Sequence, residues 1–306
     1  MKKFSKNKFL FLAIIVVAGI VPLLITGNNS LVRLVNGEAK VLFVGDMFFD
    51  RHIRKMIGVH GEDYIFSCIS DFLDGYDLVV GNLEGPITNY PSVSLGSMVG
   101  SPDNFVFTFP TGTAALLARH NIKLLNLGNN HIGNFGQEGI RSTHEYLQEA
   151  RMEYFGGLRG DDTFLRKDIK GNKISFVSYN EFGGDSLGET LEKVKEEVAI
   201  GRKVVVYAHW GEEYTEPPAR VRSAARQIVE AGAVAIIGSH PHVVLSNEKI
   251  GDSSVYYSLG NFIFDQYWDE AVRTGLALEI QIKDDQISFV EHPVEMFRDG
   301  RTCIIK

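Results

Sequence analysis

Short apolar runs recur along most of the chain, each rich in β-branched residues and closed by glycine or a polar cluster. They occupy residues 41–44, 78–80, 123–127, 174–178, 204–207, 234–237 and 255–259. Continuous apolar runs, unlike strict alternation, are typical of strands that are covered on both faces. The pattern therefore predicts an α/β fold with a mixed sheet.

Most of these runs are followed by segments that read as helices, at residues 111–119, 138–150, 187–200 and 217–231. Pro217 and Pro218 suit the start of the last helix. Residues 90–108 are rich in Pro, Ser and Gly and are expected to form a long loop. The alternating segments 276–282 and 287–290 flank Asp284 and Asp285, which predicts a closing hairpin.

The N-terminal segment indicates contact with a membrane. Four lysines precede an uncharged run at residues 9–25, which is about 26 Å long as a helix and nearly matches a bilayer core of about 30 Å. Either a cleaved signal peptide or a retained anchor fits this pattern. Residues 26–30 contain no Ala-x-Ala-like cleavage site, which favours the anchor. The positive-inside rule then makes residues 1–8 cytoplasmic, 9–26 a single transmembrane span, 27–39 a connector and 40–306 an extracytoplasmic body.

The net charge of the chain indicates which class of partner it can bind. The formal charge is −7, and without the four N-terminal lysines 27 basic residues face 38 acidic ones. Nucleic acid is therefore not an expected partner. An anionic polymer would need a local basic patch or bound cations. Cys68 and Cys303 are the only cysteines, and the sequence leaves their pairing open.

Polar side chains follow the predicted strands at the points where these strands end. They include Asp46, Glu84, His131, His209, His240 and His242, with Asn82, Asn129, Asn130 and Asn261. The carboxyl ends of strands in an open α/β sheet meet at one edge, so these side chains should converge. Carboxylate, amide and imidazole groups are ligands of Zn²⁺, Mn²⁺ and Fe²⁺, which predicts two divalent metal ions sharing one carboxylate. Pro241 is expected to hold His240 extended, so that both rings of His240-Pro241-His242 point the same way.

The strand-end motifs resemble those of the CapA family of poly-γ-glutamate capsule proteins. The similar segments are Gly45-Asp46 with Arg51, Asn82-Leu83-Glu84-Gly85-Pro86-Ile87-Thr88, Asn129-Asn130-His131, His209-Trp210-Gly211, Gly238-Ser239-His240-Pro241-His242-Val243 and Tyr257-Ser258-Leu259-Gly260-Asn261-Phe262-Ile263-Phe264-Asp265-Gln266. The resemblance covers about residues 41–266 and implies a calcineurin-like metallophosphoesterase sandwich, in which two mixed β-sheets are flanked by helices.

The resemblance also implies a role for each motif residue. Asp46 and His242 would hold the first ion, and Asn130, His209 and His240 the second, with Glu84 bridging them. His131 would stabilise the transition state or protonate the leaving oxygen. Arg51 is assigned to catalysis and Asn82 and Asn261 to substrate binding, with a structural role as the alternative for Arg51 and Asn261.

Phe48 departs from the pattern of related phosphoesterases, which carry a histidine two residues after the first aspartate. The first ion is therefore expected to be the weaker one. His52 or Asp50 would compensate if the loop doubles back.

Two functions follow from these features. The first is a membrane-anchored protein for synthesis or export of poly-γ-glutamate or another envelope polymer, with a dinuclear hydrolase site of the phosphoesterase type. The second is a non-catalytic subunit that binds an anionic polymer through metal within a capsule synthase or export complex. The expected partners are the membrane, this polymer and other synthase subunits.

Overall fold

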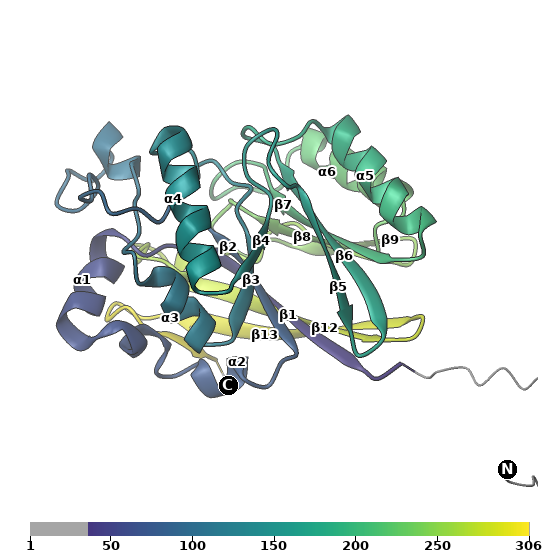
Figure 1. Ribbon diagram of the computed structural model, residues 1–306, viewed down its shortest axis with the longest axis horizontal. Coiled ribbons are helices and arrows are strands. Elements are labelled where there is room, and N and C mark those ends of the chain that lie inside the picture. The colour runs from purple at the N-terminus through teal and green to yellow at the C-terminus, as the bar shows by residue number, and fades with distance from the viewer. Residues whose placement is uncertain (1–35, 306) are drawn as a thin grey trace, which may run out of the picture. The chain divides into compact units, whose positions relative to one another are not determined.

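Two β-sheets form the centre of the body in this computed structural model, which describes residues 36–305 (Figure 1). The first sheet has eight strands in the order β14-β13-β12-β1-β2-β3-β4, with β11 beside β1. Its strands are β1 (Ala39–Met47), β2 (Leu78–Leu83), β3 (Ile122–Asn126), β4 (Glu153–Phe155), β11 (Asn261–Ile263), β12 (Thr274–Lys283), β13 (Gln286–Met296) and β14 (Thr302–Ile304). Strands β1 to β4 are parallel to one another, whereas β12, β13 and β14 are antiparallel to their neighbours.

The second sheet has six strands in the order β5-β6-β7-β8-β10-β9. They are β5 (Phe164–Ile169), β6 (Asn172–Asn180), β7 (Lys203–His209), β8 (Ala235–Ser239), β9 (Asn247–Ile250) and β10 (Ser253–Tyr256). Its four middle strands are parallel, and an antiparallel strand closes each edge. Both sheets are therefore mixed, as the sequence predicts.

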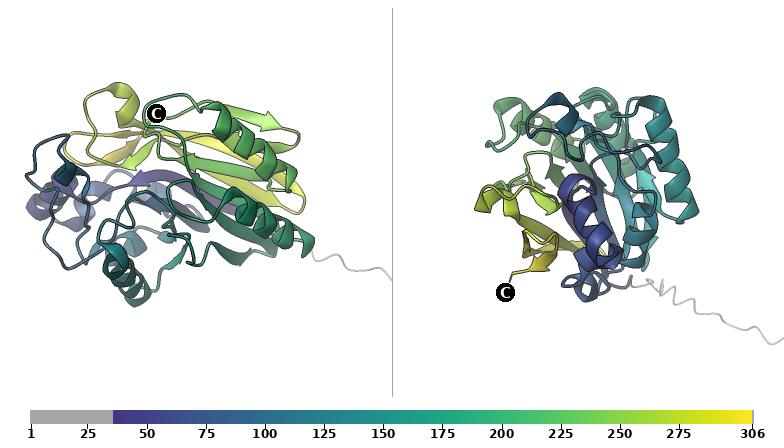
Figure 2. Two further views of the ribbon diagram at one scale, coloured as in Figure 1. Left: turned by 90° about the horizontal axis from the view of Figure 1, so that it is seen from above. Right: turned by 90° about the vertical axis from the view of Figure 1, so that its left-hand side faces the viewer.

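The two sheets pack face to face through one apolar layer. Phe43 of β1 contacts Phe176 of β6 and Tyr207 of β7, with ring centroids 6.0 and 6.3 Å apart. Helices cover the two outer faces, which explains why the strands are apolar on both sides (Figure 2). This arrangement agrees with the mixed α/β fold expected from the apolar runs and with the two-sheet sandwich that the family resemblance implies.

Helices α1 to α4 lie against the first sheet, and α5 and α6 lie against the second (Figure 1). The helices are α1 (Arg51–His60), α2 (Ser70–Leu73), α3 (Thr113–Arg119), α4 (Gly136–Glu149), α5 (Leu187–Ala199), α6 (Ala219–Glu230) and α7 (Glu270–Arg273), with single 3₁₀ turns η1 (Glu62–Phe66) and η2 (Pro102–Phe105). The four predicted helices and the closing hairpin are confirmed to within two residues at most ends. Helix α1 was not predicted; the buried Asp50 side chain begins it by accepting the backbone N–H of Arg51.

The start of the body differs slightly from the expected boundary. Strand β1 begins at Ala39, and the backbone N–H of Gly37 already bonds the carbonyl of Lys170. Residues 36–39 of the expected connector therefore belong to the body. None of the helices within residues 36–305 is long and apolar enough to cross a bilayer. The predicted span at 9–26 lies outside the described residues.

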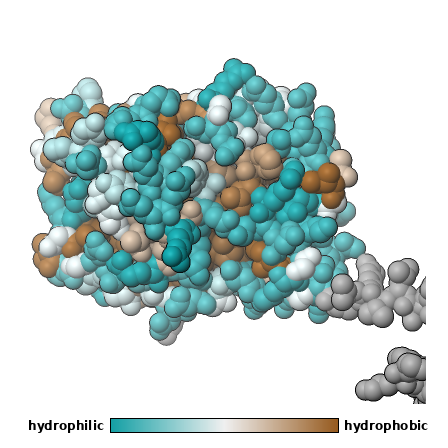
Figure 3. Space-filling model, in the orientation of Figure 1, coloured by the Kyte–Doolittle hydropathy of each residue, from teal (hydrophilic) through white to brown (hydrophobic). Residues whose placement is uncertain are grey.

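The face of the body shown in Figure 3 is mainly hydrophilic, with small separate apolar patches. Single apolar side chains on a surface are ordinary, so this face alone indicates no binding site. Most of the polar residues that the sequence singles out are instead buried at the carboxyl ends of the parallel strands.

Candidate metal centre

Glu84 lies at the centre of the predicted site, one residue after β2. Both of its carboxylate oxygens are buried, and neither has a hydrogen-bond partner in the part of the chain that the structure describes. Burial and the nearby Asp46 charge raise the pKa of the Glu84 carboxyl well above its usual value. A buried carboxylate without a partner lowers the stability of the fold by roughly several kcal/mol, unless a bound cation or a proton neutralises its charge. A divalent ion bound to these oxygens would compensate for their lack of hydrogen bonds.

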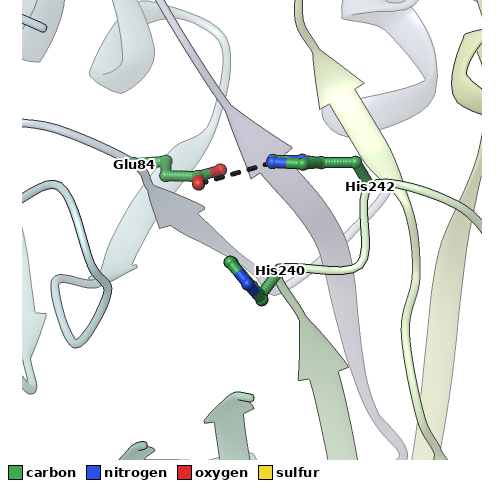
Figure 4. Close-up of side chains that lie close together, drawn as sticks. All are labelled: Glu84, His240 and His242. Carbon is green, nitrogen blue, oxygen red and sulfur yellow. Dashed lines mark ion pairs between the residues drawn. The ribbon is translucent and has the colours of Figure 1, made fainter. Parts of the chain in front are cut away.

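His240 and His242 lie beside Glu84 on the loop that follows β8 (Figure 4). One ligand atom from each of the three residues falls within 4.8 Å of the others. His242 Nε2 is 3.7 Å from Glu84 Oε1, and the buried Nδ1 of His240 has no hydrogen-bond partner among the described residues. The three side chains could therefore take part in holding metal.

The expected extended geometry of His240 is wrong. His240 has a φ of 95° and His242 a φ of 58°, both in the region that favours glycine. The chain turns sharply after Ser239, where Asp46 Oδ2 accepts the His240 backbone N–H at 3.0 Å. Such backbone geometry costs about 1–3 kcal/mol per residue, and it is concentrated at functional sites. The rings nevertheless lie 6.0 Å apart and both face Glu84 (Figure 4).

His209 and Asn130 form a second group of donor atoms. The Ser239 hydroxyl donates to the Ala208 carbonyl, so its oxygen accepts the Nδ1–H of His209 at 2.9 Å. His209 Nε2 then carries a lone pair, which faces Asn130 Oδ1 at 2.9 Å and Glu84 Oε1 at 3.9 Å. Lone pairs on all three atoms would repel one another without a cation. The bridging position predicted for Glu84, between His209 and His242, agrees with these distances.

Asp46 closes the site at the end of β1, and Asn82 holds it in place. The Asn82 Nδ2 donates to Asp46 Oδ1 at 2.8 Å, and Asp46 Oδ2 lies 3.5 Å from His242 Nδ1. The Asn82 Oδ1 accepts from Asn126 Nδ2 and Asn129 Nδ2. Asn82 is fully buried and does not line the adjoining cavity. This geometry supports a positioning role for Asn82 rather than the predicted contact with substrate.

Asn261 orients His242 in the same way. Its Oδ1 accepts the Nδ1–H of His242 at 2.9 Å, while its Nδ2 donates to Gln266 Oε1 at 3.1 Å. Such a bond to the far nitrogen fixes the ring of a metal-binding histidine. Burial lowers the pKa of His242, but the charges of Glu84 and Asp46 outweigh burial and raise it to about 9. Asn261 is also fully buried, so the alternative structural role is the one that its contacts favour.

Phe48, which stands where related phosphoesterases have a histidine, belongs to a cluster of packed aromatic rings. The Phe48 ring is fully buried and stacks on Phe264 at 4.7 Å, and Phe264 in turn contacts the His242 ring at 4.9 Å. Neither proposed substitute replaces it. The Asp50 carboxylate accepts bonds from Arg54, Ser92, Ser94 and the backbone of Thr108, and His52 Nε2 bonds the Arg298 carbonyl at 2.8 Å.

Arg51 and His131 line a cavity in front of the ligands, together with His242. The Arg51 guanidinium binds both carboxylate oxygens of Asp265 and the Asn104 backbone carbonyl, and it lies over the Phe48 ring at 4.5 Å. These contacts tie three segments of the cavity wall together. The His131 Nδ1 donates to Asn134 Oδ1 at 3.3 Å, and burial lowers the pKa of His131 to about 3. His131 is therefore a neutral imidazole at pH 7.

Two residues of this region were missed by the sequence reasoning. Glu213 and Tyr214 line the cavity, and the Tyr214 ring lies 6.1 Å from that of His242. They follow the quoted motif His209-Trp210-Gly211 by only a few residues. The strand-end rule would have found them had it been carried past Gly211.

Comparisons with known proteins identify the family of the chain. The sequence model of the family described as "Bacterial capsule synthesis protein PGA_cap" matches residues 40–266, which include every residue of the centre. The chain is 26% identical to the capsule biosynthesis protein CapA of Bacillus anthracis, over 84% of this chain and 67% of that protein. It is 28% identical to the PGA biosynthesis protein CapA of Bacillus subtilis (strain 168), over 87% and 75%. The chain therefore belongs to the PGA_cap family of bacterial capsule synthesis proteins, within the metallophosphoesterase-like superfamily.

Proposed function

We propose that this protein acts in the synthesis or export of an anionic capsule polymer of the poly-γ-glutamate type through a divalent-metal hydrolytic centre. The observation that carries the proposal is the buried Glu84 carboxylate, which lacks hydrogen-bond partners among the described residues and faces His240 and His242. The kind of polymer is inferred from the family, because the relatives are named for capsule and PGA biosynthesis.

Each residue of the centre has a distinct part in this proposal. Asp46 and His242 would hold the first ion, while Asn130, His209 and His240 would hold the second, with Glu84 shared between the two ions, which are of Mn, Zn or Fe type. A bound divalent ion would activate water and stabilise negative charge on the substrate. Neutral His131, whose one N–H is donated to Asn134, would present the lone pair of its Nε2 at the cavity end of the site as an acceptor of a proton or a hydrogen bond.

A second function is favoured by one observation. Phe48 occupies the position of a ligand found in related phosphoesterases, and its ring is packed among Phe107, Phe109 and Phe264. A centre that lacks this ligand would suit binding of an anionic polymer through metal without hydrolysis. The alternative is therefore a non-catalytic subunit of a capsule synthase or export complex.

Hydrolysis of a generic phosphodiester with added Mn²⁺ separates the two functions. We expect the full-length protein to hydrolyse it and His131→Ala to lower kcat by about 10²–10⁴-fold, the range typical of general acid–base groups. His60→Ala, which changes an exposed histidine on α1, is the control. Absence of turnover in a protein that holds metal would favour the binding function.

The proposal places the body outside the cytoplasm on a retained N-terminal anchor. The Cys68–Cys303 disulfide supports this location, because disulfides persist mainly in oxidising compartments. Cell fractionation tests it: the full chain should remain with the membranes. A shortened chain in the extracellular fluid would instead indicate a cleaved signal peptide.

A further inference from the structure

A cavity of about 540 Å³ opens in front of the metal ligands. His131 and His242 form part of its inner wall, and its mouth is lined by Val99, Phe105 and Trp268, which are 89%, 46% and 64% exposed. The cavity therefore runs from the buried ligands to the surface. It is large enough for a ligand longer than the group that would react at the metal.

Few charged side chains line this cavity, and two of them, Arg51 and Asp265, form an ion pair with each other. Arg51 is bound to Asp265 and Asn104, so its charge is neutralised within the wall. Lys55, on the exposed side of α1, has neither an ion pair nor a hydrogen bond within residues 36–305. A polymer with a carboxylate on every unit would thus find a single unpaired lysine here. One lysine can pair with the carboxylate of one polymer unit but not with the carboxylates of several consecutive units.

Glu213 adds a charge of the opposite sign to the same cavity. Within the described part of the chain, no lysine or arginine is paired with it. Glu213 lines the cavity together with His242, and it lies close enough for its charge to raise the pKa values of His240 and His242. An unpaired acid at this place would repel an internal unit of an anionic chain, whose nitrogen is a neutral amide. It would attract a terminal unit, which carries an ammonium group.

We propose that this cavity binds the free amino-terminal unit of the capsule polymer, with Glu213 pairing with its ammonium group and Lys55 with its carboxylate. The aromatic walls, which include Phe107, Phe264 and Trp268, would cover the methylene groups of the unit. The inference rests on the proposed function and adds to it that the polymer is recognised at its end. The protein would then act on chain termini and not at random along the chain.

Binding of synthetic γ-glutamyl pentamers to the full-length protein with Mn²⁺ tests this inference by calorimetry. One pentamer has a free amino end, a second is acetylated there, and a third carries a primary amide in place of the first α-carboxylate. We expect acetylation and amidation each to weaken binding by up to about fivefold, the upper end of the range for exposed ion pairs. Glu213→Gln should abolish the effect of acetylation only, and Lys55→Met the effect of amidation only.

Two substitutions on the exposed side of α5, Glu192→Gln and Lys195→Met, are matched controls and should leave all three affinities unchanged. Equal affinity for free and acetylated pentamers, or affinity that rises steadily with the number of internal units, would overturn end recognition. Absence of binding of any pentamer to a protein with normal metal content would also overturn it, while leaving the metal centre intact. Absence of metal from the protein would instead count against the proposed function.

Discussion

At the residue scale, the centre combines buried carboxylates with histidines whose second nitrogen is already bonded. Asn261 accepts from His242 Nδ1, and Ser239 accepts from His209 Nδ1, so the Nε2 atoms of both rings are directed at Glu84. The ligand types could be predicted from the sequence because they follow the strands directly. The positive φ of His240 could not, since it depends on Asp46, which is 194 residues away in sequence.

The pKa of His242 makes metal binding sensitive to pH. Without metal, the charges of Glu84 and Asp46 hold the ring protonated up to about pH 9. A metal ion must displace this proton, so the affinity for metal should rise with pH and level off above about 9. One released proton corresponds to a gain of up to about tenfold per pH unit between 7 and 9.

Titration calorimetry of Mn²⁺ in buffers with different ionisation enthalpies measures the protons that are released. We expect about one per ion bound at pH 7 in the full-length protein, and fewer in His242→Gln. His60→Gln is the matched control and should behave as the unchanged protein does. Metal affinity that is flat between pH 7 and 9 would contradict a protonated His242.

At the scale of elements, the parallel strands bring the ligands together. Asp46 is the next-to-last residue of β1 and Glu84 directly follows β2, while in the other sheet β7 ends at His209 and β8 ends just before His240. These strands could be predicted because their apolar residues form continuous runs, which are typical of strands covered on both faces. Helix α1 was missed because it has few buried apolar residues and depends on Asp50, which is also bonded by two other segments, at residues 92–94 and at Thr108.

The disulfide joins two elements that lie far apart in the sequence. Cys68, between η1 and α2, is bonded to Cys303 of β14 across a separation of 235 residues. Closing so long a loop restricts the unfolded chain, so reduction should lower the free energy of unfolding by about 2–4 kcal/mol. Guanidinium unfolding with and without reductant measures the loss. The double variant Cys68→Ser/Cys303→Ser should show the same stability in both conditions, and an equal stability of the oxidised and reduced protein would contradict the prediction.

At the scale of the whole molecule, the fold class and the convergence of the candidate ligands at the strand ends could be predicted from the sequence, whereas the cavity could not. Its walls come from α1, the loop that contains η2, the segment after β7 and the segment after β11. No local pattern relates Lys55 to Glu213 or Trp268, because their proximity depends on how loops of different lengths pack over the strand ends. The cysteine pair could not be assigned from the sequence for the same reason.

Counting the metal ions in the purified full-length protein tests the central claim most directly. After removal of free metal, we expect at least about one divalent ion per chain, since buried Glu84 lacks a hydrogen-bond partner among the described residues and a bound cation would compensate its charge. His240→Ala should remove nearly all of it, His242→Ala should mainly raise the concentration of added metal that is required, and His60→Ala should change neither. A chelator should lower the melting temperature of the unchanged protein, because metal binds the folded state alone. A protein that carries no metal, and whose melting temperature the chelator does not change, would contradict the account.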